Sequence, residues 1–132
     1  MKAADTLKTH TDSIGGHFMA YSDVRCVAIV PVPGGRTQTI TCEEVINELY
    51  NRKLLRFSSR VCPAENNYDY RMLLEQAAYF NYCRFAIRDG HLEVEALADP
   101  TAGDPVIWQE MVTEVANLAD QFELKLSGSD AN

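Results

Sequence analysis

The densest group of potentially reactive side chains lies in residues 83–96, CRFAIRDGHLEVEA. A cysteine beside a histidine is a nucleophile–base pair, and two neighbouring carboxylates are an acid–base pair. Here the first pair would be Cys83 with His91, and the second would be Glu93 with Glu95. The segment is either a reactive site or a structural part of the fold, and its residue pattern favours one of the two.

The Asp89-Gly90 dipeptide inside this segment is typical of a two-residue type I′ hairpin turn. A turn at that point predicts the cross-strand pairs Arg88–His91, Ile87–Leu92, Ala86–Glu93, Phe85–Val94, Arg84–Glu95 and Cys83–Ala96. Cys83 and His91 would then be roughly 15 Å or more apart, at about 3.3 Å per residue. A thiolate–imidazole pair needs hydrogen-bond contact, so the register predicts no dyad. Glu93 and Glu95 are predicted to be solvated carboxylates on the polar face of the hairpin.

Other motifs for chemistry are missing from the sequence. His10 and His17 are separated by Gly15-Gly16, no Cys or His pair has zinc-ligand spacing, and no glycine-rich phosphate loop is present. We therefore predict no catalytic residue, no bound cofactor and no metal site.

Composition limits the class of protein further. The 132 residues suit one domain, for which we predict residues 1–126, followed by a disordered tail over 127–132. A net charge of −7 disfavours nucleic-acid binding. No segment reads as a signal peptide or a membrane span, so we expect a cytoplasmic protein that does not bind membranes. Its four cysteines lack disulfide or metal spacing and are predicted to be free and mostly buried.

The first half of the chain predicts a helix over residues 3–13 and a hairpin over 24–42. Centring the hairpin turn on Gly34-Gly35 pairs Ile29 with Ile40. Two prolines close to the turn cannot donate to a ladder, so the strand that carries Val30 and Val32 is expected at a sheet edge near its end.

The second half adds a strand and two helices. Residues 43–51 fit either a short helix or a continuing strand, whereas 53–62 alternate as a half-buried strand. Asn66 or Asn67 is the expected cap of a helix that runs to Phe80. Asp104 caps the last helix, whose apolar stripe comprises Trp108, Met111, Val112, Val115, Leu118, Ala119 and Phe122. The predicted fold is α+β, with an antiparallel sheet of about five strands and the helices on one side, in the order α-β-β-β-α-β-β-α.

Aromatic residues crowd around the second helix. They are Tyr68, Tyr70, Tyr79, Phe80 and Tyr82. Such residues either fill the core or form a surface that another chain covers. We take part of this helix as a candidate dimer seam.

Residues 54–126 resemble the YbjN family, which shares its fold with type III secretion chaperones of the CesT kind. The similarity lies in a strand ending SSRVCP, a helix of the type LLEQAAYFNY, the hairpin RFAIRDGHLEVEA and a last helix containing LADQF. These are packing motifs, so they specify a fold better than an activity.

The resemblance implies a non-enzymatic, often homodimeric protein that binds a peptide segment of a client, or an assembly factor for a larger particle such as a carboxysome shell. The candidate contacts are Val30, Val32, Tyr68, Tyr70, Tyr79 and Tyr82. Two alternatives stay open. One is a small regulatory module with a ligand pocket between helix and sheet, and the other is an enzyme that uses Cys62 or Cys83 as nucleophile.

Overall fold

Six strands form one antiparallel sheet in the order β1-β2-β3-β4-β6-β5, in a computed structural model that describes residues 2–101 and 103–127. The strands are β1 (His17–Ser22), β2 (Arg25–Val32), β3 (Arg36–Asn47), β4 (Arg52–Pro63), β5 (Arg84–Arg88) and β6 (His91–Ala98). The helices are α1 (Lys2–Ser13), α2 (Tyr70–Ala77) and α3 (Pro105–Leu126). The α+β class is confirmed. The predicted number of strands is wrong by one, because β1 was not recognised.

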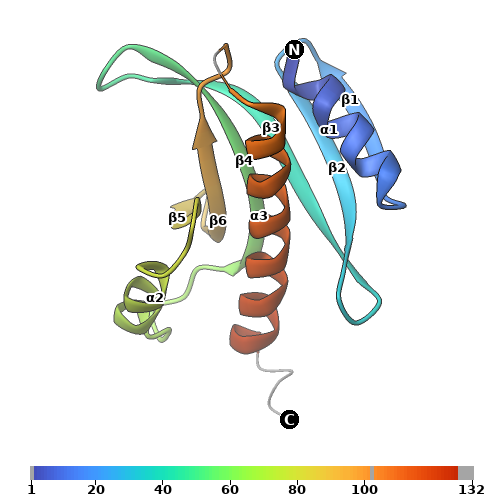
Figure 1. Ribbon diagram of the computed structural model, residues 1–132. Helices are drawn as coiled ribbons and strands as arrows, with labels where there is room; N and C mark the ends of the chain where they lie inside the picture. The colour runs from blue at the N-terminus through green and yellow to red at the C-terminus, as the bar shows by residue number, and fades with distance from the viewer. Residues whose placement is uncertain (1, 102, 128–132) are drawn as a thin grey trace.

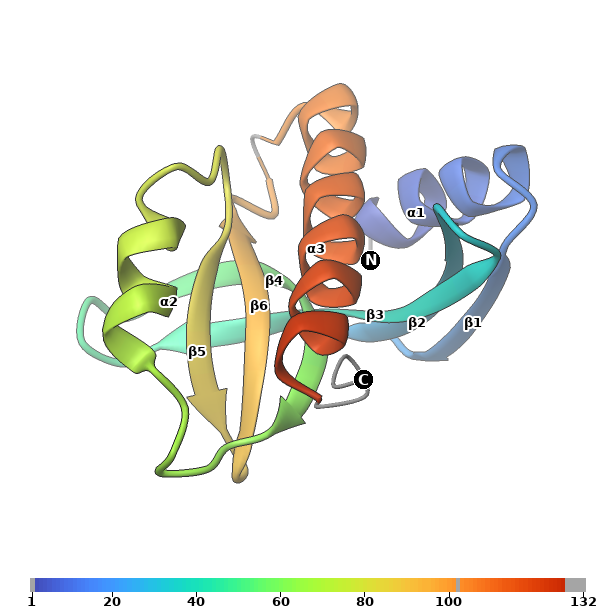
Figure 2. The ribbon, with the colours of Figure 1, turned by 90° about the horizontal axis from the view of Figure 1, so that it is seen from below.

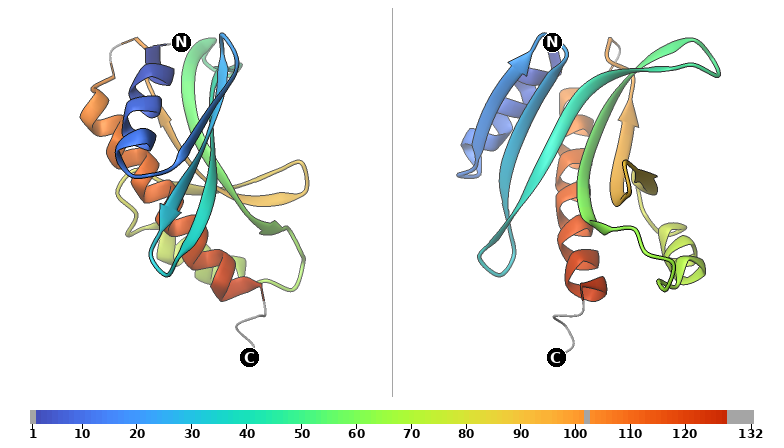
Figure 3. Two further views of the ribbon diagram at one scale, coloured as in Figure 1. Left: turned by 90° about the vertical axis from the view of Figure 1, so that its right-hand side faces the viewer. Right: turned by 180° about the vertical axis from the view of Figure 1, so that it is seen from behind.

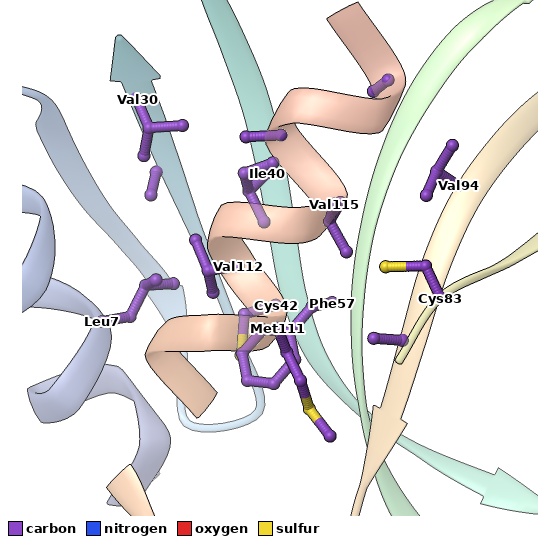
Figure 4. Packing of buried hydrophobic residues seen from close by; sticks show 14 of the residues in the cluster. Leu7, Val30, Ile40, Cys42, Phe57, Cys83, Val94, Met111, Val112 and Val115 are labelled. Atoms are coloured by element: carbon purple, nitrogen blue, oxygen red, sulfur yellow. The ribbon is translucent and has the colours of Figure 1, made fainter. Parts of the chain in front are cut away.

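Helices α1 and α3 lie side by side over one face of the sheet, which we call the inner face (Figure 1). Their apolar stripes and the inward side chains of β2, β3, β4 and β6 form one buried cluster. Figure 4 shows Val112 and Val115 of α3 between Leu7 of α1 and Val94 of β6. Helix α2 lies at the other end of the sheet, next to β5 (Figure 2).

The register of the β2–β3 hairpin differs from the predicted one by a single residue. Val32 pairs with Arg36, so the loop has three residues and Ala28, not Ile29, opposes Ile40. A slip of one residue exchanges the two faces of a strand. The buried face of β2 therefore carries Cys26, Ala28, Val30 and Val32.

The strand that carries Val30 and Val32 is at a sheet edge near its end, as predicted, because β1 stops short of Val30, but the rest of the strand lies inside the sheet. Strand β2 lies between β1 and β3, and Val30 is only 2% exposed. The prolines are tolerated because the last β1–β2 pair is His17 with Ile29, so Pro31 lies beyond the end of β1.

Of the ambiguous residues 43–51, the first five continue the strand. Strand β3 runs to Asn47, a turn follows, and β4 begins at Arg52. Asn51 has a φ of +51°, a left-handed conformation that asparagine adopts more readily than most residues. The strand alternative is the correct one.

The ends of the two later helices test the predicted caps. Asp104 caps α3 as predicted, since its carboxylate accepts the N–H of Val106 at 2.9 Å. The prediction for α2 is wrong: the cap is Asp69, which accepts the N–H of Met72 at 3.0 Å. Of the predicted tail only Ser127 is described, as the residue that ends α3; residues 128–132 lie outside the described part.

The β5–β6 hairpin has the predicted register. Arg88 pairs with His91 and Arg84 with Glu95, across a turn in which Asp89 and Gly90 have φ values of +53° and +75°. Both values fit a type I′ turn. The segment that holds most of the chemistry-bearing residues is thus an edge hairpin of the sheet.

Candidate partner-binding site

An apolar groove runs between α2 and the edge hairpin β5–β6. We call it the α2–β5 groove, and it is lined by Tyr70, Leu73, Leu74, Phe85, Ala86, Ile87 and Leu92. Its volume is about 560 Å³ including open solvent, of which about 280 Å³ admits a water-sized molecule. Leu74 and Ile87 on its two walls are 68% and 60% exposed. Large aliphatic side chains this exposed on facing elements are typical of a surface that another molecule covers.

The predicted tyrosines have different environments. Tyr70 lines the groove and donates its hydroxyl to the carbonyl of Glu65, and Tyr79 is almost fully exposed. Tyr82 donates its hydroxyl to Glu110 on α3. Contact with the Cys62 thiol, together with burial, raises the pKa of Tyr68 to about 12. Tyr68, Tyr70 and Tyr82 are all half-buried and packed against the core. Tyr79 is therefore the one of these four that is exposed, and Tyr70 reaches a partner only as part of the groove wall.

Neither Leu74 nor Ile87 was among the predicted contacts. The Leu73-Leu74 doublet held a usable signal, because adjacent residues on a helix are about 100° apart and one short helix face seldom buries both. Only Leu73 is buried. Alternation along the hairpin predicts that Ile87 shares a buried face with Phe85, but it lies next to the turn and is exposed.

The carboxylates of the β5–β6 hairpin are not solvated, which corrects the sequence prediction. Glu95 is 1% exposed and Glu93 is also buried. Arg84 Nε donates to Glu95 Oε2 at 2.8 Å, and Arg88 lies 2.7 Å from Glu93 and 2.9 Å from Glu95. The long arginine side chains cover the acids, an effect that alternation along a strand does not reveal.

The face of the sheet opposite α1 and α3, which we call the outer face, is turned toward the viewer in Figure 3, right. Arginines and hydroxyl groups continue the polar surface across it. A hollow of about 800 Å³ lies over this face, and its walls include Arg25, Arg56, Arg60, Thr39 and Ser58. Arg56 pairs with Glu43 at 2.7 Å, while Arg60 lies 3.7 Å from Glu93. Most of this charge is thus compensated within the sheet.

Glu114 of α3 fixes the chain between α2 and β5. Its carboxylate accepts the backbone N–H groups of Asn81, Tyr82 and Cys83 at 2.7, 2.6 and 2.9 Å. Burial acts to raise the pKa of Glu114, but these N–H donors outweigh it and hold the pKa below its usual range. This carboxylate sets where β5 starts and therefore where one wall of the groove lies.

Replacing Glu114 with glutamine should lower the free energy of unfolding by about 2 kcal/mol at neutral pH, since bonds to a charged acceptor are lost. A pKa that is lower in the folded state gives stability above the unfolded pKa, and this is lost as pH falls through the folded pKa. The gap between wild type and E114Q in urea unfolding should therefore narrow on acidification. A gap that stays the same across the acid range would contradict this role.

The four cysteines are free and buried, as predicted. Burial raises the pKa of the Cys62 and Cys83 thiols, and contact with Glu114 raises that of Cys83 further. A nucleophilic cysteine needs a lowered pKa and access to substrate. Cys62 and Cys83 have raised pKa values and are buried, so neither side chain suits the nucleophile of the enzyme alternative.

Metal and interior ligand sites were also considered. Among the described residues, no three His, Cys, Asp or Glu side chains gather as metal ligands. The space between α1, α3 and the sheet, lined by Leu7, Phe57, Trp108 and Val112 among others, leaves no room for a water molecule. The ligand pocket that the regulatory alternative expects between helix and sheet is therefore filled at this point.

Comparison with known proteins gives no family assignment. The chain matches no model of a known protein family, and a search of curated proteins finds no relative. The resemblance to the YbjN and secretion-chaperone group stays a prediction. Within the described ranges, no helix combines the length and apolar character that crossing a membrane requires.

Proposed function

We propose that this protein is a non-enzymatic adaptor or chaperone that holds a short extended segment of a protein partner in the α2–β5 groove. The observation that carries the proposal is the pair of exposed aliphatic walls, Leu74 and Ile87, on either side of an apolar groove. An assembly factor that binds a component of a larger particle is one form of this function.

The size of the groove favours side chains over a whole small molecule. Ligand pockets usually enclose roughly 300–1,000 Å³ and bury most of the ligand. The α2–β5 groove is near the lower limit and open, so it suits one or a few apolar side chains of a longer segment.

The position of the groove favours an extended segment. Strand β5 ends the sheet, and no strand of the described chain pairs with its outer edge. Because the two-residue turn closes on the Arg88–His91 pair, we expect the backbone groups of Phe85 and Ile87 to face away from β6. An extended peptide along β5 would meet these groups and would direct alternate side chains into the groove.

A second candidate function, a ligand-sensing module, is favoured by the hollow on the outer face. Arg25, Arg56 and Arg60 line this hollow. Guanidinium groups bind the carboxylate or phosphate of a small organic anion in bidentate geometry.

Selection from a library of displayed linear peptides tests the first function. We expect enrichment of sequences with apolar residues at alternate positions, and at least a tenfold loss of affinity in Leu74→Lys. Losing the burial of one leucine side chain against the peptide costs about 1.5–3 kcal/mol of binding free energy. Each 1.4 kcal/mol raises the Kd about tenfold. Leu49→Lys, the same change at an exposed leucine in the β3–β4 turn, is the matched control and should bind as wild type does.

Two results would overturn this function. One is the absence of any enriched peptide, and the other is binding that Leu74→Lys and Ile87→Lys both leave unchanged. Thermal stabilisation by small organic anions without peptide binding would favour the ligand-sensing module instead.

A further inference from the structure

Strand β1 is the other edge of the sheet, and it is open. It pairs only with β2, and in Figures 2 and 3 no element of the described chain lies beyond it. Five of its six residues are exposed, and they include Met19, which is 41% exposed, and Tyr21. Helix α1 packs over the inner side of β1 and β2 and leaves the outer edge free (Figure 1).

The usual protection of an edge strand is weak here. Natural edges carry lysines, prolines, inward charges or bulges that prevent pairing with another chain. Strand β1, HFMAYS, has no proline and no lysine. A register shift between Ala20 and Ser22 disturbs one end, but His17–Ala20 pairs regularly with β2.

The edge is also free of charge in an acidic protein. Residues 13–22, SIGGHFMAYS, contain no Asp, Glu, Lys or Arg, although 23% of the chain is charged and its net charge is −7. Two copies of this chain repel each other over most of their surface. A two-fold interface brings the same patch of both copies together, so an uncharged edge avoids this repulsion.

We propose that two copies of this chain pair through β1, antiparallel and about a two-fold axis, to form one continuous sheet. The aromatic residues around the second helix predict a dimer interface there. This proposal assigns self-association to the opposite end of the sheet and leaves the α2–β5 groove to a different partner.

Symmetry restricts the register of such a pair. The axis stands perpendicular to the sheet, so residues that face the same side must oppose one another. The regularly paired residues His17–Ala20 overlap most fully when either Phe18 or Met19 lies opposite its own copy. In both registers the two Met19 side chains lie on the same face, directly opposite or one diagonal step apart, close enough for direct interaction.

The same symmetry argument disfavours a dimer in which the β5 strands of two copies pair. Full overlap of two β5 strands centres on Ala86, and it places Arg84 of one copy opposite Arg88 of the second copy. Like charges directly opposite each other in a sheet are destabilising. The two edges thus differ in the partner that their chemistry allows.

Charge substitutions at Met19 test the proposal in sedimentation equilibrium. Wild type should have twice the monomer mass, and Met19→Glu and Met19→Lys should each be monomeric because every dimer would bring two like charges together. Mixing the two variants should restore the doubled mass, since Glu then faces Lys. Ile87→Glu, the matched change on β5, should remain dimeric.

A monomeric wild type, a dimeric Met19→Glu variant, or a mixture that stays monomeric would each overturn the proposal. Hydrogen exchange of wild type provides a readout that depends on no variant. The amides of residues 17–20 should become less protected on dilution, and protection that is independent of concentration would also contradict β1 pairing. None of these measurements depends on whether the α2–β5 groove binds a peptide.

Discussion

Arg88→Ala is expected to lower the free energy of unfolding by about 3 kcal/mol, because the buried carboxylates of Glu93 and Glu95 lose the cation that they share. Arg88 is the shared partner of Glu93 and Glu95, at 2.7 and 2.9 Å. The remaining arginines, Arg84 and Arg60, are more exposed and bind the acids from the solvent side. Urea unfolding monitored by circular dichroism measures the change.

Arg71→Ala is the matched control for this prediction. Arg71 also pairs with a glutamate, Glu75, but at 3.3 Å between two exposed side chains on α2. Such a pair contributes less than about 1 kcal/mol. Equal losses in the two variants would show that the hairpin acids are solvated after all.

Phe122→Ala is expected to cost about 4 kcal/mol, since it removes a fully buried ring and leaves a cavity. The Phe122 ring contacts Phe85 of β5 at a centroid distance of 5.0 Å and Phe80, which follows α2, at 6.0 Å. These three rings connect α3 to both walls of the α2–β5 groove. We therefore expect the variant to lose peptide affinity as well as stability.

Leu124→Ala, two positions further along α3, is the control for the helix itself. Leu124 is partly exposed, and its replacement should change the unfolding free energy by less than about 1 kcal/mol. Thermal and urea unfolding of both variants give the comparison. A Phe122→Ala protein as stable as Leu124→Ala would contradict the packing described for these rings.

The two hairpins show why one register was predictable and the other was not. Asp89-Gly90 specifies a two-residue turn, so every pair of β5 and β6 follows from it. The segment Pro33-Gly34-Gly35 allows a two- or a three-residue loop, and both glycines have positive φ in the actual loop. Local sequence did not distinguish these loops, and the one-residue difference exchanged the buried and exposed faces of β2.

Strand β1 was missed because its pattern carries no signal of burial. Periodicity reveals a strand when one side is apolar and the other polar, whereas in β1 only Phe18 is even partly buried. Its existence depends on pairing with β2, a non-local contact.

The α2–β5 groove was predictable only in part. The aromatic residues drew attention to the correct helix, and Tyr70 does line the groove. The exposure of Leu74 and Ile87 depends on where the sheet ends relative to α2, which hydrophobic spacing does not encode. The burial of Glu93 and Glu95 likewise depends on how far neighbouring arginines extend across the sheet.

Methyl NMR of the protein with a selected peptide tests the central claim most directly, because it locates the binding surface residue by residue. We predict that chemical-shift changes will concentrate on the methyl groups of Leu73, Leu74, Ile87 and Leu92, which line the groove. The methyl groups of Ile46 and Leu49, exposed near the β3–β4 turn, should not change. Shifts confined to residues outside the groove, or no shifts at saturating peptide, would contradict the account.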